Sequence, residues 1–80
     1  MKARVEVRLK SGVLDPQGKA VEESLRHLGV EGVSDVRVGK LIEFSVNASD
    51  AEHARTAAQR VCDQLLVNAV IEKYELNIEE

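Results

Sequence analysis

The chain begins with a strict alternation of apolar and charged residues. Lys, Arg and Glu occupy the even positions from 2 to 10, and the odd positions carry Ala3, Val5, Val7 and Leu9. A period of two predicts a strand with one packed face and one solvated, charged face. The segment 70–78 alternates in the same way and places Tyr74, Leu76 and Ile78 on one side, which predicts a second strand of this kind.

Two segments have helical periodicity. In the first, Asp15 stands at the N-cap position, Pro16 at the first helical position, and Gly29 at the end. We expect this helix to bury Val21, Leu25 and Leu28. In the second, Ser49 and Glu52 have the spacing of a capping box. We expect this helix to bury Ala51, Ala54, Ala58, Val61, Leu65 and Cys62, and its alanines would let it approach a sheet closely.

The segment 33–47 is rich in β-branched residues. Val36 and Val38 share their parity with Ile42, Phe44 and Val46. A three-residue turn at 39–41, with Gly39 in the unusual conformation, would keep both sets on one face of a hairpin. One long bent strand over 33–47 is the alternative.

The order of elements is therefore β-α-β-β-α-β. The economical assembly is a ferredoxin-like α+β fold, a four-stranded antiparallel sheet with two helices on one face. The other face would carry the charges of the first strand with Glu43, Lys73 and Glu75. At 80 residues, the length fits a single domain, residues 1–80.

Composition narrows the function. The chain has 11 Lys+Arg against 14 Asp+Glu and two aromatic residues, Phe44 and Tyr74, which argues against nucleic acid. One cysteine allows no internal disulfide, and two distant histidines give no metal-ligand spacing. No apolar run reaches the length of a membrane span, so we expect a cytoplasmic protein. We find no catalytic set. A core this small also favours self-association, for which Leu41, Ile71 and Tyr74 are candidates.

Two local features have competing interpretations. The run 15–19 places Gly18 and Lys19 in a helix N-terminus, which can hold an anion, but it lacks the spacing of a phosphate loop and Asp15 would repel phosphate. We interpret the run as a structural cap, with a partner contact as the alternative because Gly18 costs helix stability. Arg37 and Lys40 would leave the predicted hairpin as a protruding basic pair.

Three runs together resemble a known family. Residues 10–21 (KSGVLDPQGKAV), 35–40 (DVRVGK) and 65–74 (LLVNAVIEKY) are similar, in order, to signatures of the PurS family, the small subunit of phosphoribosylformylglycinamidine synthase. The resemblance extends from about residue 2 to the end. Two positions depart from the usual pattern, Leu41 and Ala69, where the family often has an aromatic residue and a proline.

The resemblance implies a non-catalytic subunit in purine biosynthesis. The complex converts formylglycinamide ribonucleotide into formylglycinamidine ribonucleotide and consumes glutamine and ATP. The subunit, as a homodimer or in isolation a tetramer, would bridge the PurQ glutaminase and the PurL synthetase and assist ammonia transfer. ATP and magnesium would bind the synthetase, and no cofactor would bind this chain. The partner-interface candidates are Lys10, Gly12, Asp15, Gln17, Gly18, Arg37, Gly39 and Lys40.

Two other functions fit a ferredoxin-like chain. Such domains often pair to form ligand sites, so a small-molecule-sensing regulatory module is the alternative function. A free-standing enzyme of acylphosphatase type is disfavoured, because residues 11–14 (SGVL) do not form the glycine-rich anion loop that those enzymes carry after the first strand.

Overall fold

The computed structural model describes residues 1–79 and has three strands and two helices. In chain order the elements are β1 (Lys2–Leu9), α1 (Pro16–His27), β2 (Lys40–Ser45), α2 (Ala51–Val61), a π-helical turn η1 (Cys62–Leu66) and β3 (Glu72–Glu79). The strands form one antiparallel sheet in the order β2-β1-β3. The predicted α+β, ferredoxin-like class with an antiparallel sheet is confirmed.

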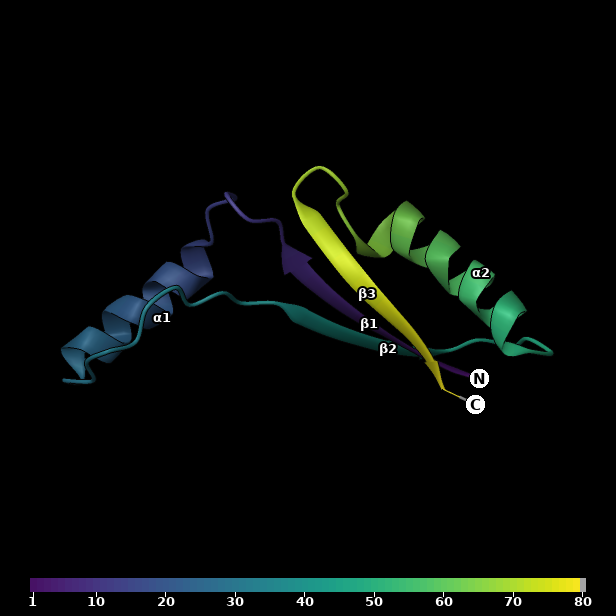
Figure 1. Ribbon diagram of the computed structural model, residues 1–80, viewed down its shortest axis with the longest axis horizontal. Coiled ribbons are helices and arrows are strands. Elements are labelled where there is room, and N and C mark those ends of the chain that lie inside the picture. Colours follow the sequence, from purple (N-terminus) through teal and green to yellow (C-terminus); the bar gives the residue numbers. More distant parts are fainter. Residues whose placement is uncertain (80) are drawn as a thin grey trace.

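The register of the sheet gathers the apolar residues on one face. Val5 lies opposite Ile42 on β2 and Leu76 on β3. The helix α2 packs on this inner face, as Figure 1 shows, and its alanines Ala54 and Ala58 are fully buried, as predicted. The residues that complete the core are Val7, Cys62 and Val67, with Phe44, Leu66 and Tyr74 packed against them.

The helix α1 begins as predicted but does not cover the sheet. The Asp15 side chain caps it, Pro16 opens it, and the chain leaves it at Gly29 with φ of +81°. It extends beyond the end of the sheet, beside the chain that returns to β2 (Figure 1). We call residues 10–39 the arm. The radius of gyration of 16.2 Å exceeds the roughly 12 Å of a compact chain of this length, which reflects the projecting arm.

The predicted burial of α1 is therefore wrong within one chain. Val21 and Leu28 are 42% and 77% exposed, and Leu25 is half-buried. The helix α1 is amphipathic as predicted, but of the two helices in residues 1–79 only α2 packs on the inner face of the sheet, so the sheet does not cover the apolar side of α1.

The predicted hairpin at 39–41 does not form, and the sheet has three strands instead of four. Gly39 also lacks the positive φ that such a turn would require. The backbone N–H groups of Val36 and Val38 donate to the side chains of Glu22 and Asp15 at 2.9 and 2.7 Å. The segment is thus extended along α1 and continues into β2 without a reversal, which is closer to the long bent alternative (Figure 1).

Three expectations for the second helix need correction. Its N-cap is Asp50, not Ser49, because the Asp50 carboxylate accepts the His53 N–H at 2.8 Å. Leu65 is 82% exposed, whereas Leu66 packs on the core. The π-helical turn explains this error, since one extra residue in the last turn shifts the inward position by one. Val61, also expected inside, is 38% exposed.

The charged outer face of the sheet is confirmed, because Glu43, Lys73 and Glu75 are exposed there. Of the β1 residues on this face, Lys2 and Arg8 are exposed and Arg4 and Glu6 are half-buried. Within residues 1–79, no helix is long and apolar enough to span a membrane.

Candidate functional site at the base of the arm

The predicted partner-interface residues gather where the arm meets the sheet. The arm leaves the end of β1 and returns at the start of β2, so both of its ends lie side by side (Figure 1). This junction, which we call the arm base, contains Lys10, Gly12, Asp15, Gln17, Gly18, Arg37, Gly39 and Lys40. Their contacts show what each contributes there.

Asp15 joins the two sides of the arm base. Its carboxylate is 4% exposed, and it accepts the Gly18 N–H at 2.8 Å with one oxygen and the Val38 N–H at 2.7 Å with the other. The hydrogen bond from Gly18, followed by the one from Val38, holds the pKa of Asp15 below its usual value. The predicted cap is therefore also a tie between the start of α1 and the returning chain.

Gly18 and Gly39 permit close approach of two backbone segments. A Cβ on Gly18 would lie 2.0 Å from the Val36 carbonyl oxygen, and one on Gly39 would lie 2.8 Å from the Val7 carbonyl oxygen. Both distances are shorter than real Cβ contacts. The glycine in the first turn of α1, which had no evident local reason in the sequence, is thus explained by packing within the chain.

Two cations fix the loop that leads into the arm. Arg37 donates to the Val13 carbonyl at 2.8 Å and to the Lys10 carbonyl at 3.2 Å. The Lys10 ammonium donates to the Ala69 carbonyl at 2.7 Å, and its backbone N–H donates to Ile71 at 2.8 Å. Because no hairpin forms, Arg37 does not protrude from a tip and instead holds the loop against the returning chain. Gly12, with φ of +86°, makes the turn within this loop.

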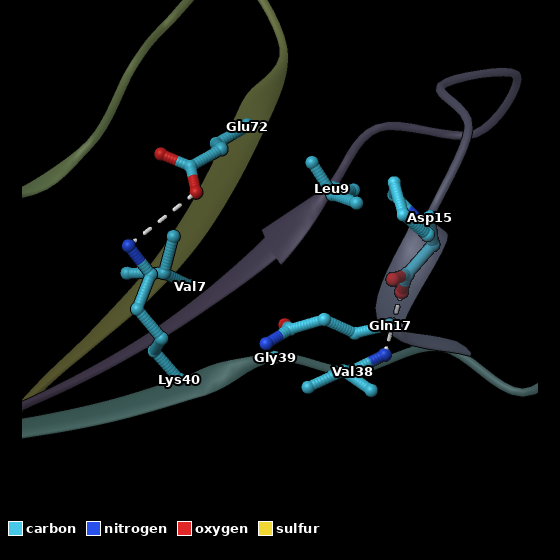
Figure 2. Close-up of a pocket in the computed structure, with 9 residues that line it drawn as sticks. Val7, Leu9, Asp15, Gln17, Val38, Gly39, Lys40 and Glu72 are labelled. Atoms are coloured by element: carbon cyan, nitrogen blue, oxygen red, sulfur yellow. Dashed lines mark hydrogen bonds and ion pairs between the residues drawn. The ribbon is translucent and has the colours of Figure 1, made fainter. Parts of the chain in front are cut away.

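A pocket of about 430 Å³ lies between the first turn of α1 and the end of the inner face of the sheet. Figure 2 shows Asp15 and Gln17 on the α1 side, facing Lys40 and Glu72 on the sheet side. Lys40 and Glu72 form an ion pair at 3.6 Å. Four of the eight predicted residues line this pocket: Asp15, Gln17, Gly39 and Lys40.

Sequence reasoning missed two carboxylates of the arm base. Glu22 accepts the Val36 N–H at 2.9 Å, and this bond lowers the pKa of Glu22. Glu72 pairs with Lys40 and accepts the Asn68 N–H at 2.8 Å. The alternation of β3 contained the signal for Glu72, since its parity equals that of Tyr74 and places it on the inner face.

The three self-association candidates differ in their exposure. Leu41 is 51% and Ile71 38% exposed. Tyr74 is half-buried against the core, and its hydroxyl donates to Asp63 at 3.3 Å. Leu41 and Ile71 are thus accessible to a partner, whereas Tyr74 mostly serves the fold.

The polar side chains that line the pocket at the arm base are Asp15, Gln17, Lys40 and Glu72, and two of them, Lys40 and Glu72, are paired with each other. The residues that line the pocket include no histidine, cysteine, serine or threonine that could act as an activated nucleophile or its base. Cys62 is fully buried in the core, and burial raises the pKa of its thiol. Among residues 1–79, no group of three His, Cys, Asp or Glu side chains is placed to hold a metal ion.

Known proteins share this sequence and fold. Residues 2–80 match the family described as "PurS: Phosphoribosylformylglycinamidine (FGAM) synthase". The phosphoribosylformylglycinamidine synthase subunit PurS of Synechocystis is 49% identical over 71 residues, which cover 89% of this chain and 71% of that one. The structure of Bacillus subtilis PurS matches with a TM-score of 0.87 and 42% identity, over 99% of this chain and 98% of that chain.

A third similarity is to a multisubunit assembly. A chain in the structure of PurLQS from Thermotoga maritima matches with a TM-score of 0.86 and 37% identity, over 95% of this chain and 93% of that chain. Together with the fold, these similarities define the class as a small α+β subunit of the purine-biosynthetic enzyme phosphoribosylformylglycinamidine synthase. The chain belongs to the PurS family.

Proposed function

We propose that this chain is the non-catalytic subunit that joins a PurQ-type glutaminase to a PurL-type synthetase in the cytoplasm, and that it assists the passage of ammonia between them. The observation that carries the proposal is the use of the signature residues at the arm base. Asp15, Gly18 and Arg37 make structural contacts that fix the direction of the arm.

The chemistry of the reaction gives such a subunit its purpose. Ammonia released from glutamine must reach the synthetase site before water protonates it, so the two sites must be held in a fixed relation. A rigid scaffold achieves this without reacting itself. ATP and magnesium belong to the synthetase in this proposal, and this chain binds neither. The similarity to a chain of PurLQS supports the assembly.

The arm supports a homodimer as the working form. Val21 and Leu28 lie on one apolar side of α1, and within residues 1–79 they stay 42% and 77% exposed. In a twofold dimer, each chain covers the arm of the other by the same contact, so both exposed faces are buried at once. Leu41 and Ile71 provide further apolar surface, and pairing of two dimers would give a tetramer in isolation.

Sedimentation of purified PurL-type and PurQ-type subunits tests the bridging role. With this chain, ATP, magnesium and glutamine present, we expect one species that contains all three proteins. Without it, the two large subunits should sediment separately. A complex of the two large subunits that forms equally well without this chain would contradict the proposal.

A further inference from the structure

The outer face of the sheet has well-matched charges at one end. Near the start of β1, Lys2 pairs with Glu43 at 3.1 Å. Arg4 lies 3.7 Å from Glu43 on β2 and 3.7 Å from Glu79 on β3. These cross-strand pairs of opposite charge are the arrangement that stabilises a sheet.

The other end of the same face has the reverse arrangement. Arg8 lies directly opposite Lys73, and Glu6 lies directly opposite Glu75. Like charges placed opposite one another across two strands are destabilising. If Arg8 and Glu6 exchanged places, each of the two cross-strand pairs would join opposite charges. The fold itself therefore does not require the like-charged pairs. The cost to stability indicates a requirement outside the chain.

Basic side chains from three segments gather at this end. Arg8 of β1, Arg37 of the arm and Lys73 of β3 line a hollow of about 300 Å³. The neighbouring hollow, of about 330 Å³, is lined by Arg8, Arg37 and Lys40, and also by Glu6. Arg8 contacts Glu6 at 3.3 Å, yet its side chain remains 69% exposed. We call Arg8, Arg37 and Lys73 the basic end of the outer face.

We propose that the basic end is the docking surface for a carboxylate-rich segment of one of the large subunits. This inference rests on the proposed function and names the chemistry of the contact. The chain has a formal charge of −3, whereas this hollow is surrounded by three cations and is locally positive. Carboxylates that enter the hollow remove the repulsion between Arg8 and Lys73, so binding recovers free energy that the isolated chain lacks.

The surroundings favour protein carboxylates over a phosphate or a nucleic acid. Arg37 already donates to the Val13 and Lys10 carbonyls, so its guanidinium acts mainly through its charge and does not clamp a phosphate. The acidic row of Glu6 and Glu75 lies directly beside the basic row, so a long polyanion that crossed both would be repelled. Within residues 1–79, the hollow that Arg8, Arg37 and Lys73 share has no acidic residue in its lining, so a short acidic segment of a folded partner can enter it without meeting Glu6 or Glu75.

The substitution Lys73→Glu tests the proposal in the complete three-protein assembly. It weakens attraction for carboxylates, and we expect the Kd of assembly to rise about tenfold and its salt dependence to become weaker. In the isolated chain it places a carboxylate opposite Arg8, so the Tm should not fall below that of the wild type. A merely structural role would instead lower stability and affinity together.

Two further variants complete the test. Arg8→Gln removes the other member of the basic row and should also raise the Kd. Arg60→Glu makes the same change of charge at an exposed position on α2 and should leave the Kd within twofold of the wild type. Circular dichroism on each variant confirms the fold.

Four results would overturn the docking surface. The first is an unchanged Kd for both Lys73→Glu and Arg8→Gln, and the second is a loss of affinity with Arg60→Glu equal to that with Lys73→Glu. The third is a Tm for Lys73→Glu below that of the wild type together with its loss of affinity. The fourth is a rise in the Tm of the isolated chain with inorganic phosphate that depends on Lys73. A wild-type chain that forms no assembly would contradict the proposed function itself, and is distinguishable because it precedes any comparison of variants.

Discussion

The carboxylate of Asp15 accepts the backbone N–H of Val38 at 2.7 Å across 23 residues of chain. The second oxygen of the same carboxylate accepts the N–H of Gly18 in the first turn of α1 at 2.8 Å. One side chain thereby closes the base of the arm, and the N-cap that the sequence shows is at the same time a long-range contact.

Asp15 should make the stability of the folded chain depend on pH in the acidic range. Its pKa is lowered in the folded chain by the hydrogen bonds from Gly18 and Val38, so its contribution is complete above the unfolded pKa of about 4 and is lost as the pH falls through the folded pKa. Asp15→Asn should show a smaller loss of Tm between pH 5 and pH 2 than the wild type. Glu22 and Asp50 also have lowered pKa values, so part of the acid dependence should remain.

Removal of the Asp15 carboxylate, whose two oxygens are both hydrogen-bond acceptors, tests the contribution of Asp15 to stability at neutral pH. Asp15→Ala leaves the N–H groups of Gly18 and Val38 without their partner, and we expect the Tm to fall by about 5–10 °C. Thermal unfolding followed by circular dichroism measures this. A Tm equal to that of the wild type would show that the tie at the arm base contributes nothing.

Gly18→Ala should destabilise the chain although alanine is the better helix former. A Cβ at this position would meet the Val36 carbonyl oxygen at 2.0 Å, so the arm base must open. We expect the free energy of unfolding in urea to fall by more than about 2 kcal/mol. Ser24→Ala in the exposed part of the same helix is the control and should change it by less than about 0.5 kcal/mol. A more stable Gly18→Ala variant would contradict the close approach.

The π-helical turn predicts different effects for two adjacent leucines. Leu66 packs on the core, whereas Leu65 is 82% exposed. Leu66→Ala should lower the free energy of unfolding by about 1–3 kcal/mol, and Leu65→Ala by less than about 0.5 kcal/mol. Urea denaturation of the two variants compares them directly. The reverse order would mean that α2 continues as a regular α-helix through residue 66.

The uncovered face of α1 predicts the oligomeric state. Light scattering of the wild type should give a mass of at least twice 8.8 kDa at micromolar concentration. Leu28→Glu places a charge on this face and should shift the mass to that of a monomer. Leu65→Glu, at a similarly exposed leucine in η1, should leave the mass unchanged. A wild-type monomer would contradict the homodimer.

The sequence predicted best what depends on neighbours along the chain. The alternation of β1 and β3, the cap at Asp15 and the alanine face of α2 all follow from local periodicity and capping, and all are present. The eight partner-interface candidates came instead from the family resemblance, and the structure brings them together at the arm base. Whether they contact a partner stays a prediction.

What the sequence could not show depends on distant partners. The pattern of Val21 and Leu28 indicates a face to be covered but not the chain that covers it. Val36 and Val38 have the parity of a strand, yet two carboxylates of the arm satisfy their N–H groups in place of a neighbouring strand. The shift from Leu65 to Leu66 arises from one π-helical turn that periodicity does not indicate.

The rate of formylglycinamidine ribonucleotide formation by PurL-type and PurQ-type subunits, with and without this chain, tests the central claim most directly. With glutamine as the nitrogen source, the rate should depend on this chain. With ammonium salts as the nitrogen source, the synthetase should work at the same rate whether or not this chain is present. This pair of results is expected of a subunit that joins two active sites and catalyses nothing. Equal glutamine-dependent rates in the presence and absence of the chain would contradict the account.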